Sequence, residues 1–402
     1  MDGFALFQGF EEKKKYSCVS CGLYKFCNSP KMPPTGNFKK KILVIGSRPA
    51  EIDDAHGKQF VGIGGRGLKK ALAENGIDLQ EDCLSVNAIR CYTRKEPTKP
   101  QYTIQLEACR SKTLQVIEKY KPNVIILVGD TAARSVIAHR WKKNFDNINK
   151  WRGWVIPDQD FKAWVCPVYD PATFDVKNET EATTILKQDI ARIAQHVHKK
   201  PLISEEPEIE YITDLNLLKN ITNGTIAFDY ETTGLKPYGK GHRIVCASVA
   251  DNTNHVYTFL MPKSRKERKP FIDLLQDEFV YKMAHNMKFE DNWTNVRLGT
   301  GIKGWMFDSQ VAAHIIDNRA GVTGLKFQTY VMLGIVDYDS EISPVLQSKD
   351  GTSNGFNTVQ EYIAKSKGNE RKILKYCALD SIYEYRIAMM MQRQMNYDML
   401  PF

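Results

Sequence analysis

The sequence predicts an α/β protein with two domains, and three features of the chain indicate this. Its length of 402 residues suggests two or three domains. In the first half, short apolar runs of strand type alternate with helical stretches, which is typical of a mostly parallel sheet with helices on both faces. The second half carries acidic motifs on a strand and on a helix. We expect domains over residues 1–197 and 213–402, with a polar, proline-containing linker over 198–212.

Composition and charge narrow the class of protein. A hydrophobic content of 42% is ordinary for a globular chain, and no run approaches 18 apolar residues. The N-terminal residues lack the pattern of a signal peptide, so we expect a cytoplasmic protein. Residues 1–200 hold 33 Lys and Arg against 22 Asp and Glu, a net charge of +11, whereas residues 201–402 have a net charge of −2. The basic first half indicates nucleic-acid binding, with solubility as the alternative explanation.

The predicted elements of the first half follow one another closely. An apolar strand over 41–46 is followed by a glycine-rich loop over 57–68, which is either a phosphate-binding loop or simply a tight one. A charged, proline-containing loop is expected from Cys91 to Cys109. The remaining elements expected here are strands over 83–88, 124–128 and 163–168 and helices over 112–120 and 132–139.

The stretch from Thr225 to Leu235 is a predicted buried strand that ends in a turn. Asp229 and Glu231 lie two residues apart, so on a strand both carboxylates point to one face. Adjacent acids repel each other, and hard cations such as Mg²⁺ or Mn²⁺ prefer oxygen ligands. The stretch therefore indicates a metal site, with two solvated acids as the alternative.

Two later motifs extend this acidic pattern. His285–Asp291 follows an apolar run, and Tyr376 and Asp380 lie four residues apart in a helical pattern over 373–390. The i, i+4 spacing places the phenol and the carboxylate on one helical face. Acids on three elements together with a tyrosine suit phosphodiester hydrolysis assisted by two metal ions.

In these motifs and their order, residues from about 210 to 402 resemble the DEDDy 3′–5′ proofreading exonuclease domain of family A DNA polymerases. The resemblance implies a ribonuclease-H-like mixed sheet and two divalent cations, Mg²⁺ or Mn²⁺. It makes Asp229, Glu231 and Asp380 metal ligands and Tyr376 the residue that orients the attacking water. Contacts to the DNA strand would come from Thr232, Leu235, Asn286 and Lys288. The family's second-motif aspartate is replaced by Glu290, and the neighbouring Asp291 is the alternative residue for that role.

Nine cysteines without a secretion signal make disulfides improbable and favour a metal or cluster site. The pair Cys18 and Cys21 alone fits zinc, a redox pair or a cluster. Residues from about 10 to 197 resemble the iron–sulfur, family 4 uracil-DNA glycosylases, a parallel-sheet three-layer fold. The resemblance rests on this pair, on the Gly46–Ala50 turn, and on the positions of Phe60, Asn87, Cys91 and Cys109. It implies a [4Fe–4S] cluster on Cys18, Cys21, Cys91 and Cys109, with zinc as the alternative.

The same resemblance assigns a base pocket, with two departures. Phe60 would stack on a flipped base and Asn87 would read its Watson–Crick edge. The acidic residue expected after Gly46 is replaced by Ser47, and the histidine that would stabilise negative charge on the uracil is replaced by Asp170. We therefore expect a DNA-binding domain that has lost most or all glycosylase activity.

These motifs lead to one function and two alternatives. The leading prediction is a 3′–5′ DNA exonuclease that acts on a single-stranded 3′ end or primer–template. Because the chain ends shortly after the third motif, we expect a proofreading subunit that works with a separate polymerase subunit, in a viral, phage-like replication system and hence in the cytoplasm of a host bacterium. The alternatives are a bifunctional uracil-DNA glycosylase and exonuclease for repair, and a non-catalytic scaffold that clamps DNA.

Overall fold

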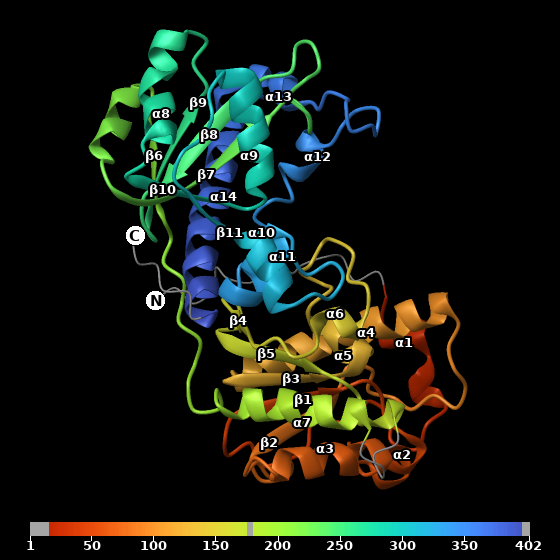
Figure 1. The fold of residues 1–402 in the computed structure, drawn as a ribbon. Helices are drawn as coiled ribbons and strands as arrows, with labels where there is room; N and C mark the ends of the chain where they lie inside the picture. The colour runs from red at the N-terminus through yellow and green to blue at the C-terminus, as the bar shows by residue number, and fades with distance from the viewer. Residues whose placement is uncertain (1–15, 175–179, 396–402) are drawn as a thin grey trace, which may run out of the picture. The chain divides into compact units, whose positions relative to one another are not determined.

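The computed structural model describes residues 16–174 and 180–395, and the chain divides into two compact units (Figure 1). The first unit comprises Met1–Ile203 with Leu333–Ile335, and the second unit comprises the other residues. Each unit is built from a β-sheet and helices, so the predicted α/β fold class is confirmed. Within the described ranges, no helix is long and apolar enough to cross a membrane.

A five-stranded sheet in the order β2-β1-β3-β5-β4 forms the centre of the first unit. All neighbouring strands are parallel except β4, which is antiparallel to β5. Helices α3 and α7 pack on one face, α5 packs on the other, and α4 lies against α5 (Figure 1). The strands are β1 Ile42–Gly46, β2 Cys83–Asn87, β3 Val124–Val128, β4 Ile156–Asp158 and β5 Ala163–Val168. The helices are α1 Cys18–Cys21, η1 Leu23–Lys25, α2 Glu51–His56, α3 Ile63–Ala73, α4 Lys99–Tyr120, α5 Gly129–Val136, α6 Ile148–Trp151, η2 Pro171–Thr173 and α7 Glu181–Ala194.

The expected loop from Cys91 to Cys109 is shorter than predicted, because α4 already begins at Lys99. Pro100 lies in the first turn, where a missing N–H group costs nothing. Thr98 and Gln101 form a capping box, in which the Thr98 backbone N–H donates to Gln101 Oε1 over 2.9 Å. Cys109 is therefore held on a helix and not on a loop.

The second unit has a six-stranded mixed sheet in the order β11-β10-β7-β8-β9-β6. Strand β7 is parallel to β10 and antiparallel to β8. Helix α8 packs on one face, and the long helix α14 crosses the other (Figure 1). The strands are β6 Glu208–Tyr211, β7 Gly224–Thr232, β8 Ile244–Ala250, β9 His255–Leu260, β10 Val280–Ala284 and β11 Trp305–Asp308. The helices are η3 Leu215–Asn220, α8 Arg265–Gln276, α9 Met287–Trp293, η4 Thr294–Leu298, α10 Ser309–Ile316, α11 Leu325–Leu333, α12 Ser343–Leu346, α13 Val359–Lys365 and α14 Lys367–Gln394.

Part of the range expected as a linker, 198–212, is a strand of the second sheet. Residues Glu208–Tyr211 form β6, which pairs in parallel with β9 from Glu208 opposite His255 to Tyr211 opposite Thr258. The prolines at 201 and 207 precede this strand, so the backbone N–H groups that the ladder needs are all present.

Candidate functional site

The alternation of β7 separates its apolar and acidic side chains. Phe228 and Tyr230 pack into the core on the α8 side of the sheet. Asp229 and Glu231 point to the other face, opposite Ser248 and Cys246 of β8. Asp229 is half-buried, and Glu231 is only 6% exposed. The strand therefore carries two carboxylates beneath α14.

Helix α14 brings the third-motif residues to this face. Ligand atoms of Asp229, Glu231 and Cys377 lie within 4.8 Å of one another. The Cys377 thiol donates weakly toward the Asp229 carboxylate and backbone oxygens, and burial raises its pKa. Cys377 is thus a protonated neighbour, and a poor ligand for a hard cation.

Asp380 and Tyr376 lie one helical turn apart on α14 and are both buried. Asp380 forms an ion pair with Lys326 of α11, and Tyr338 Oη donates to Asp380 Oδ1 over 2.8 Å. The Lys326 ammonium also lies 4.3 Å from the centre of the Tyr376 ring. Tyr376 packs in an apolar cluster, and burial, followed by the charges of Asp380 and Glu231, raises its pKa. The phenol therefore stays protonated beside these acids.

The buried acids repel one another. Burial, and after it the charge of Asp380, raises the pKa of Asp229 to about 8, with Lys326 opposing the shift. Burial and the charge of Asp229 likewise raise the pKa of Glu231 well above its ordinary value. Fully ionised, these acids would carry more negative charge than Lys326 can balance, so a divalent cation that replaces their protons fits this site.

Glu290 and Asp291, the two alternatives at the second motif, have different surroundings. Glu290 is buried, and its Oε2 has no hydrogen-bond partner among the described residues. Burial and the charge of Asp229 raise its pKa. Asp291 is turned elsewhere, since its Oδ2 accepts a hydrogen bond from Asn295 Nδ2 over 2.9 Å and its Oδ1 one from Trp305 Nε1. The geometry therefore favours Glu290 as the acid that faces the site.

The residues expected to touch the DNA strand fall into two groups. Leu235 is 61% exposed, and Asn286 and Lys288 at the start of α9 are also exposed. Asn286 has a φ of 71°, and its N–H donates to Asp308 Oδ1. Thr232 is buried, and its hydroxyl donates to the Gly234 carbonyl over 2.6 Å. Thr232 thus shapes the turn that presents Leu235.

Three residues at this site were not singled out from the sequence: Lys326, Tyr338 and Glu384. Lys326 and Tyr338 lie between the second and third acidic motifs, in a part of the sequence that carries neither motif. Glu384 is four residues after Asp380, so the same i, i+4 rule that linked Tyr376 to Asp380 would have found it.

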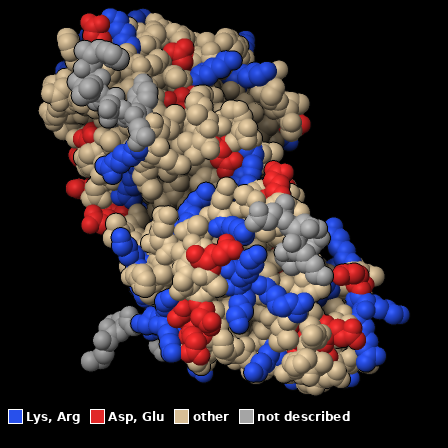
Figure 2. All heavy atoms as spheres, turned by 60° about the horizontal axis from the view of Figure 1, so that its bottom comes forward, with Lys and Arg blue, Asp and Glu red and all other residues tan. Residues whose placement is uncertain are grey.

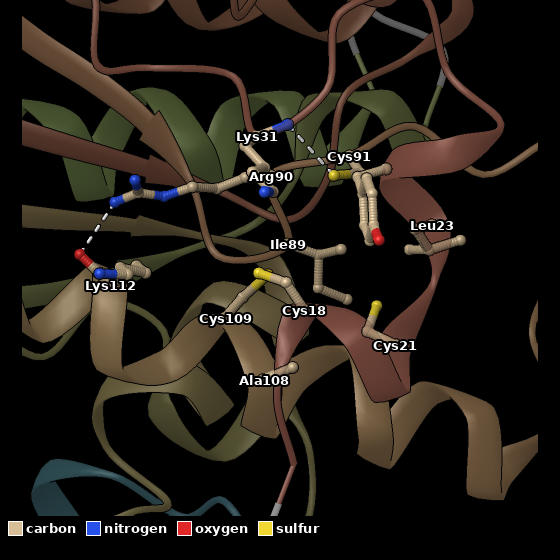
Figure 3. Close-up of a pocket in the computed structure, with 11 residues that line it drawn as sticks. Cys18, Cys21, Leu23, Lys31, Ile89, Arg90, Cys91, Ala108, Cys109 and Lys112 are labelled. Atoms are coloured by element: carbon tan, nitrogen blue, oxygen red, sulfur yellow. Dashed lines mark hydrogen bonds between the residues drawn. The ribbon is translucent and has the colours of Figure 1, made fainter. Parts of the chain in front are cut away.

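In the first unit, Cys18, Cys21, Cys91 and Cys109 line one cavity of about 130 Å³ (Figure 3). Cys18 and Cys21 come from α1, Cys91 from the segment after β2, and Cys109 from α4. The Lys31 N–H donates to Cys91 Sγ over 3.2 Å. No three of the four sulfur atoms lie within 4.8 Å of one another. The structure thus brings the four cysteines around one space.

The expected base-pocket residues also converge. A Cβ atom on Gly46 would lie 2.4 Å from Asn87 Oδ1 and 2.8 Å from Phe60 Cζ, so only glycine fits between these side chains. Asn87 is 3% exposed, and its Nδ2 lacks a partner within the described part of the chain. Next to them, Ser47 Oγ donates to Asp170 Oδ2 over 3.3 Å. Burial raises the pKa of Asp170, so this carboxyl takes the place of the expected histidine in a poorly hydrated position.

The loop that carries Phe60 depends on Asp53, which the sequence did not single out. Asp53 Oδ1 accepts hydrogen bonds from the N–H groups of Val61 and Gly62, and its Oδ2 accepts one from Ala50. Phe60 itself has a φ of 61°, a conformation that L-residues rarely adopt. The buried Asp53 offsets part of that strain.

The basic side chains of the first unit do not form one band on the face seen in the lower part of Figure 2. Lys and Arg are spread across it, with Asp and Glu between them. The net positive charge of this half therefore supports a diffuse attraction for polyanions on that face.

Comparison with known proteins agrees with this geometry. Residues 33–191 match the model of the uracil DNA glycosylase superfamily, and residues 207–396 match that of a 3′-5′ exonuclease family. A type-4 uracil-DNA glycosylase of Saccharolobus solfataricus is 28% identical over 189 residues, which are 46% of this chain and 84% of that protein. One from Archaeoglobus fulgidus is 29% identical over 160 residues, 39% of this chain and 77% of the relative.

Solved structures similar to the chain include Brucella melitensis NrnC with bound Mg²⁺, at 18% identity and a TM-score of 0.34, covering 48% of this chain and 82% of that one. Escherichia coli RNase D, an exoribonuclease, has 15% identity and a TM-score of 0.35, covering 48% of this chain and 46% of the other. From the family matches, this chain joins a domain of the uracil DNA glycosylase superfamily to a 3′-5′ exonuclease domain.

Proposed function

We propose that the second unit removes nucleotides from the 3′ end of DNA by metal-dependent hydrolysis. The observation that carries this proposal is the convergence of Asp229, Glu231, Glu290 and Asp380 around one buried site with Lys326 as the paired cation. An exonuclease domain of this family implies divalent metal, and the oxygen-rich donor set fits Mg²⁺ or Mn²⁺.

The chain's own residues supply positioning and charge. Bound divalent cations would lower the pKa of the attacking water and stabilise the leaving 3′ oxygen. Asp229, Glu231 and Asp380 would hold these ions, while Lys326 would give up its ion pair with Asp380. The protonated Tyr376 hydroxyl would orient the water toward phosphorus. As the P–O3′ bond breaks, a nucleoside 5′-monophosphate leaves and a new 3′ hydroxyl remains.

The accessible residues suggest how a strand reaches the acids. Leu235 would pack against the terminal base, and Asn286 and Lys288 would hold the strand from the start of α9. A nucleic-acid ligand is common to both families in this chain. A proofreading role beside a separate polymerase stays a prediction from sequence, and co-purification from the native source tests it.

For the first unit, we propose a DNA-binding domain with an iron–sulfur cluster and reduced glycosylase activity. Its type-4 relatives imply a cluster. The shared cavity lined by Cys18, Cys21, Cys91 and Cys109 supports a bound metal group, for which zinc is the alternative to the [4Fe–4S] cluster. Its role would be to fasten α1 and α4 to the segment after β2.

The Asp229→Ala variant tests the exonuclease directly. We expect wild-type protein with Mg²⁺ to shorten a 5′-labelled primer–template from its 3′ end, and Asp229→Ala to be slower by roughly 10²–10³-fold or more. The same assay with single-stranded DNA and with RNA shows which substrate is degraded fastest. Equal rates for the two proteins, or a rate that EDTA leaves unchanged, would contradict the proposal.

The metal-free second unit should lose stability as pH rises. Asp229 has a pKa of about 8 in the folded chain and about 4 when unfolded, so between these values only the folded state holds the proton. Asp229 alone should therefore lower the free energy of opening by up to about 1.4 kcal/mol per pH unit over this window. Glu231 and Glu290 should add to this loss, and Mg²⁺ should oppose it. Hydrogen exchange of β7 peptides in EDTA, corrected for intrinsic rates, measures this, and Asp229→Asn should make the profile less steep.

Iron analysis distinguishes the two metal assignments of the cysteine site. Anaerobically purified protein should contain about four iron atoms per chain and show a visible absorption band. Cys91→Ala should lose both, whereas Cys27→Ser, which alters a thiol hydrogen-bonded to Cys91, should keep them. A content of one zinc atom per chain and no iron would contradict the proposed iron–sulfur cluster.

Uracil release tests the departure at Asp170. Wild-type protein in excess should release little free uracil from single-stranded uracil-DNA, because a carboxylate opposes the negative charge that develops on the base. Asp170→His should increase release by roughly 10²-fold, and adding Asn87→Ala should abolish the gain. Rapid release by the wild type would favour the bifunctional repair enzyme.

A further inference from the structure

Glu384 is a buried carboxylate that neither the family match nor the sequence motifs assign to the site. It lies on α14 one turn beyond Asp380 and two turns beyond Tyr376. All three side chains are buried, and Glu384 is the most enclosed of them at 2% exposure. An acid enclosed to this degree needs either a proton or a cation.

Neighbouring elements fix the orientation of Glu384. Ser309 at the start of α10 donates its hydroxyl hydrogen to Glu384 Oε2. The same Ser309 hydroxyl receives a hydrogen bond of 2.8 Å from His285 Nδ1, just after β10. Burial lowers the pKa of His285 to about 4, so this imidazole is neutral and gives Glu384 no counter-charge.

The other oxygen of Glu384 is left without a partner. Glu384 Oε1 and Glu290 Oε2 are both buried, and neither has a hydrogen-bond partner in the described part of the chain. Glu384 lies one helical turn from Asp380, on the same face of α14. Burial raises the pKa of Glu384 to about 8, and the charges of Asp308, Asp229 and Asp380 add to the shift. After burial and the charge of Asp229, the charge of Glu384 also raises the pKa of Glu290. Glu384 therefore interacts electrostatically with the acids of the proposed metal site.

We propose that Glu384 is an additional ligand of the second divalent cation, shared with Glu290 and oriented by Ser309 and His285. The two unpartnered oxygens carry this inference, which rests on the proposed exonuclease function.

Counting bound Mn²⁺ tests this inference without relying on activity. The metal-free full chain is titrated with Mn²⁺, and the free ion is followed by electron paramagnetic resonance. We expect the wild type to bind two ions, and Glu384→Gln to bind the second at least roughly tenfold more weakly. Ser309→Ala keeps every carboxylate and should weaken binding of the second ion less than Glu384→Gln does. Glu370→Gln, on the first turn of the same helix, is the matched control and should bind like the wild type.

Thermal unfolding shows whether Glu384→Gln is folded, so that weaker Mn²⁺ binding can be distinguished from a folding defect. Glu384→Gln is isosteric and removes a buried charge, so in EDTA it should melt at or above the wild-type temperature, while Mn²⁺ should raise its melting temperature less. Two ions bound by Glu384→Gln with wild-type affinities would overturn this inference alone. A wild type that binds no Mn²⁺ and digests no DNA would overturn the exonuclease as well.

Discussion

Repulsion among buried carboxylates is the constraint on which the second unit's site depends. Asp229 and Glu231 share a face of β7 because side chains alternate along a strand, and α14 covers that face with Asp380. Burial and the charges of neighbouring acids raise the pKa values of Asp229 and Glu231, and Lys326 offsets only part of the repulsion. Such an arrangement costs stability in a folded protein unless a ligand compensates, so its presence is explained by cation binding.

The first unit is organised around the four cysteines that line one cavity. Its cysteines come from three separate segments, and each sulfur faces a common cavity rather than a second sulfur at bonding distance. In the base pocket, Gly46 leaves the room in which Phe60 and Asn87 meet, and Asp53 holds the Phe60 loop in a conformation that it would not adopt alone. Asp170, where the glycosylase resemblance calls for a histidine, accepts a hydrogen bond from Ser47 next to these residues.

Much of this arrangement follows from local sequence patterns. The period-two spacing of Asp229 and Glu231 and the i, i+4 spacing of Tyr376 and Asp380 predicted which faces they occupy. The alternation of elements predicted the mostly parallel sheet of the first half, whereas the mixed sheet of the second half was implied by the resemblance to proofreading exonuclease domains. Features that depend on tertiary neighbours were not predicted. The start of α4 at Lys99 was missed because a proline in the first turn was read as part of a loop. Lys326 meets the acids only through its ion pair with Asp380, a contact between distant segments, whereas Glu384 follows the local i, i+4 spacing from Asp380.

Anomalous diffraction from crystals soaked in Mn²⁺ would test the central claim most directly, because it locates the ions without reference to activity. We expect one peak bounded by Asp229, Glu231 and Asp380, with Lys326 turned away from Asp380. We expect a second peak beside Glu290. A map with no peak among these carboxylates, and with Lys326 still paired to Asp380 at saturating Mn²⁺, would contradict it.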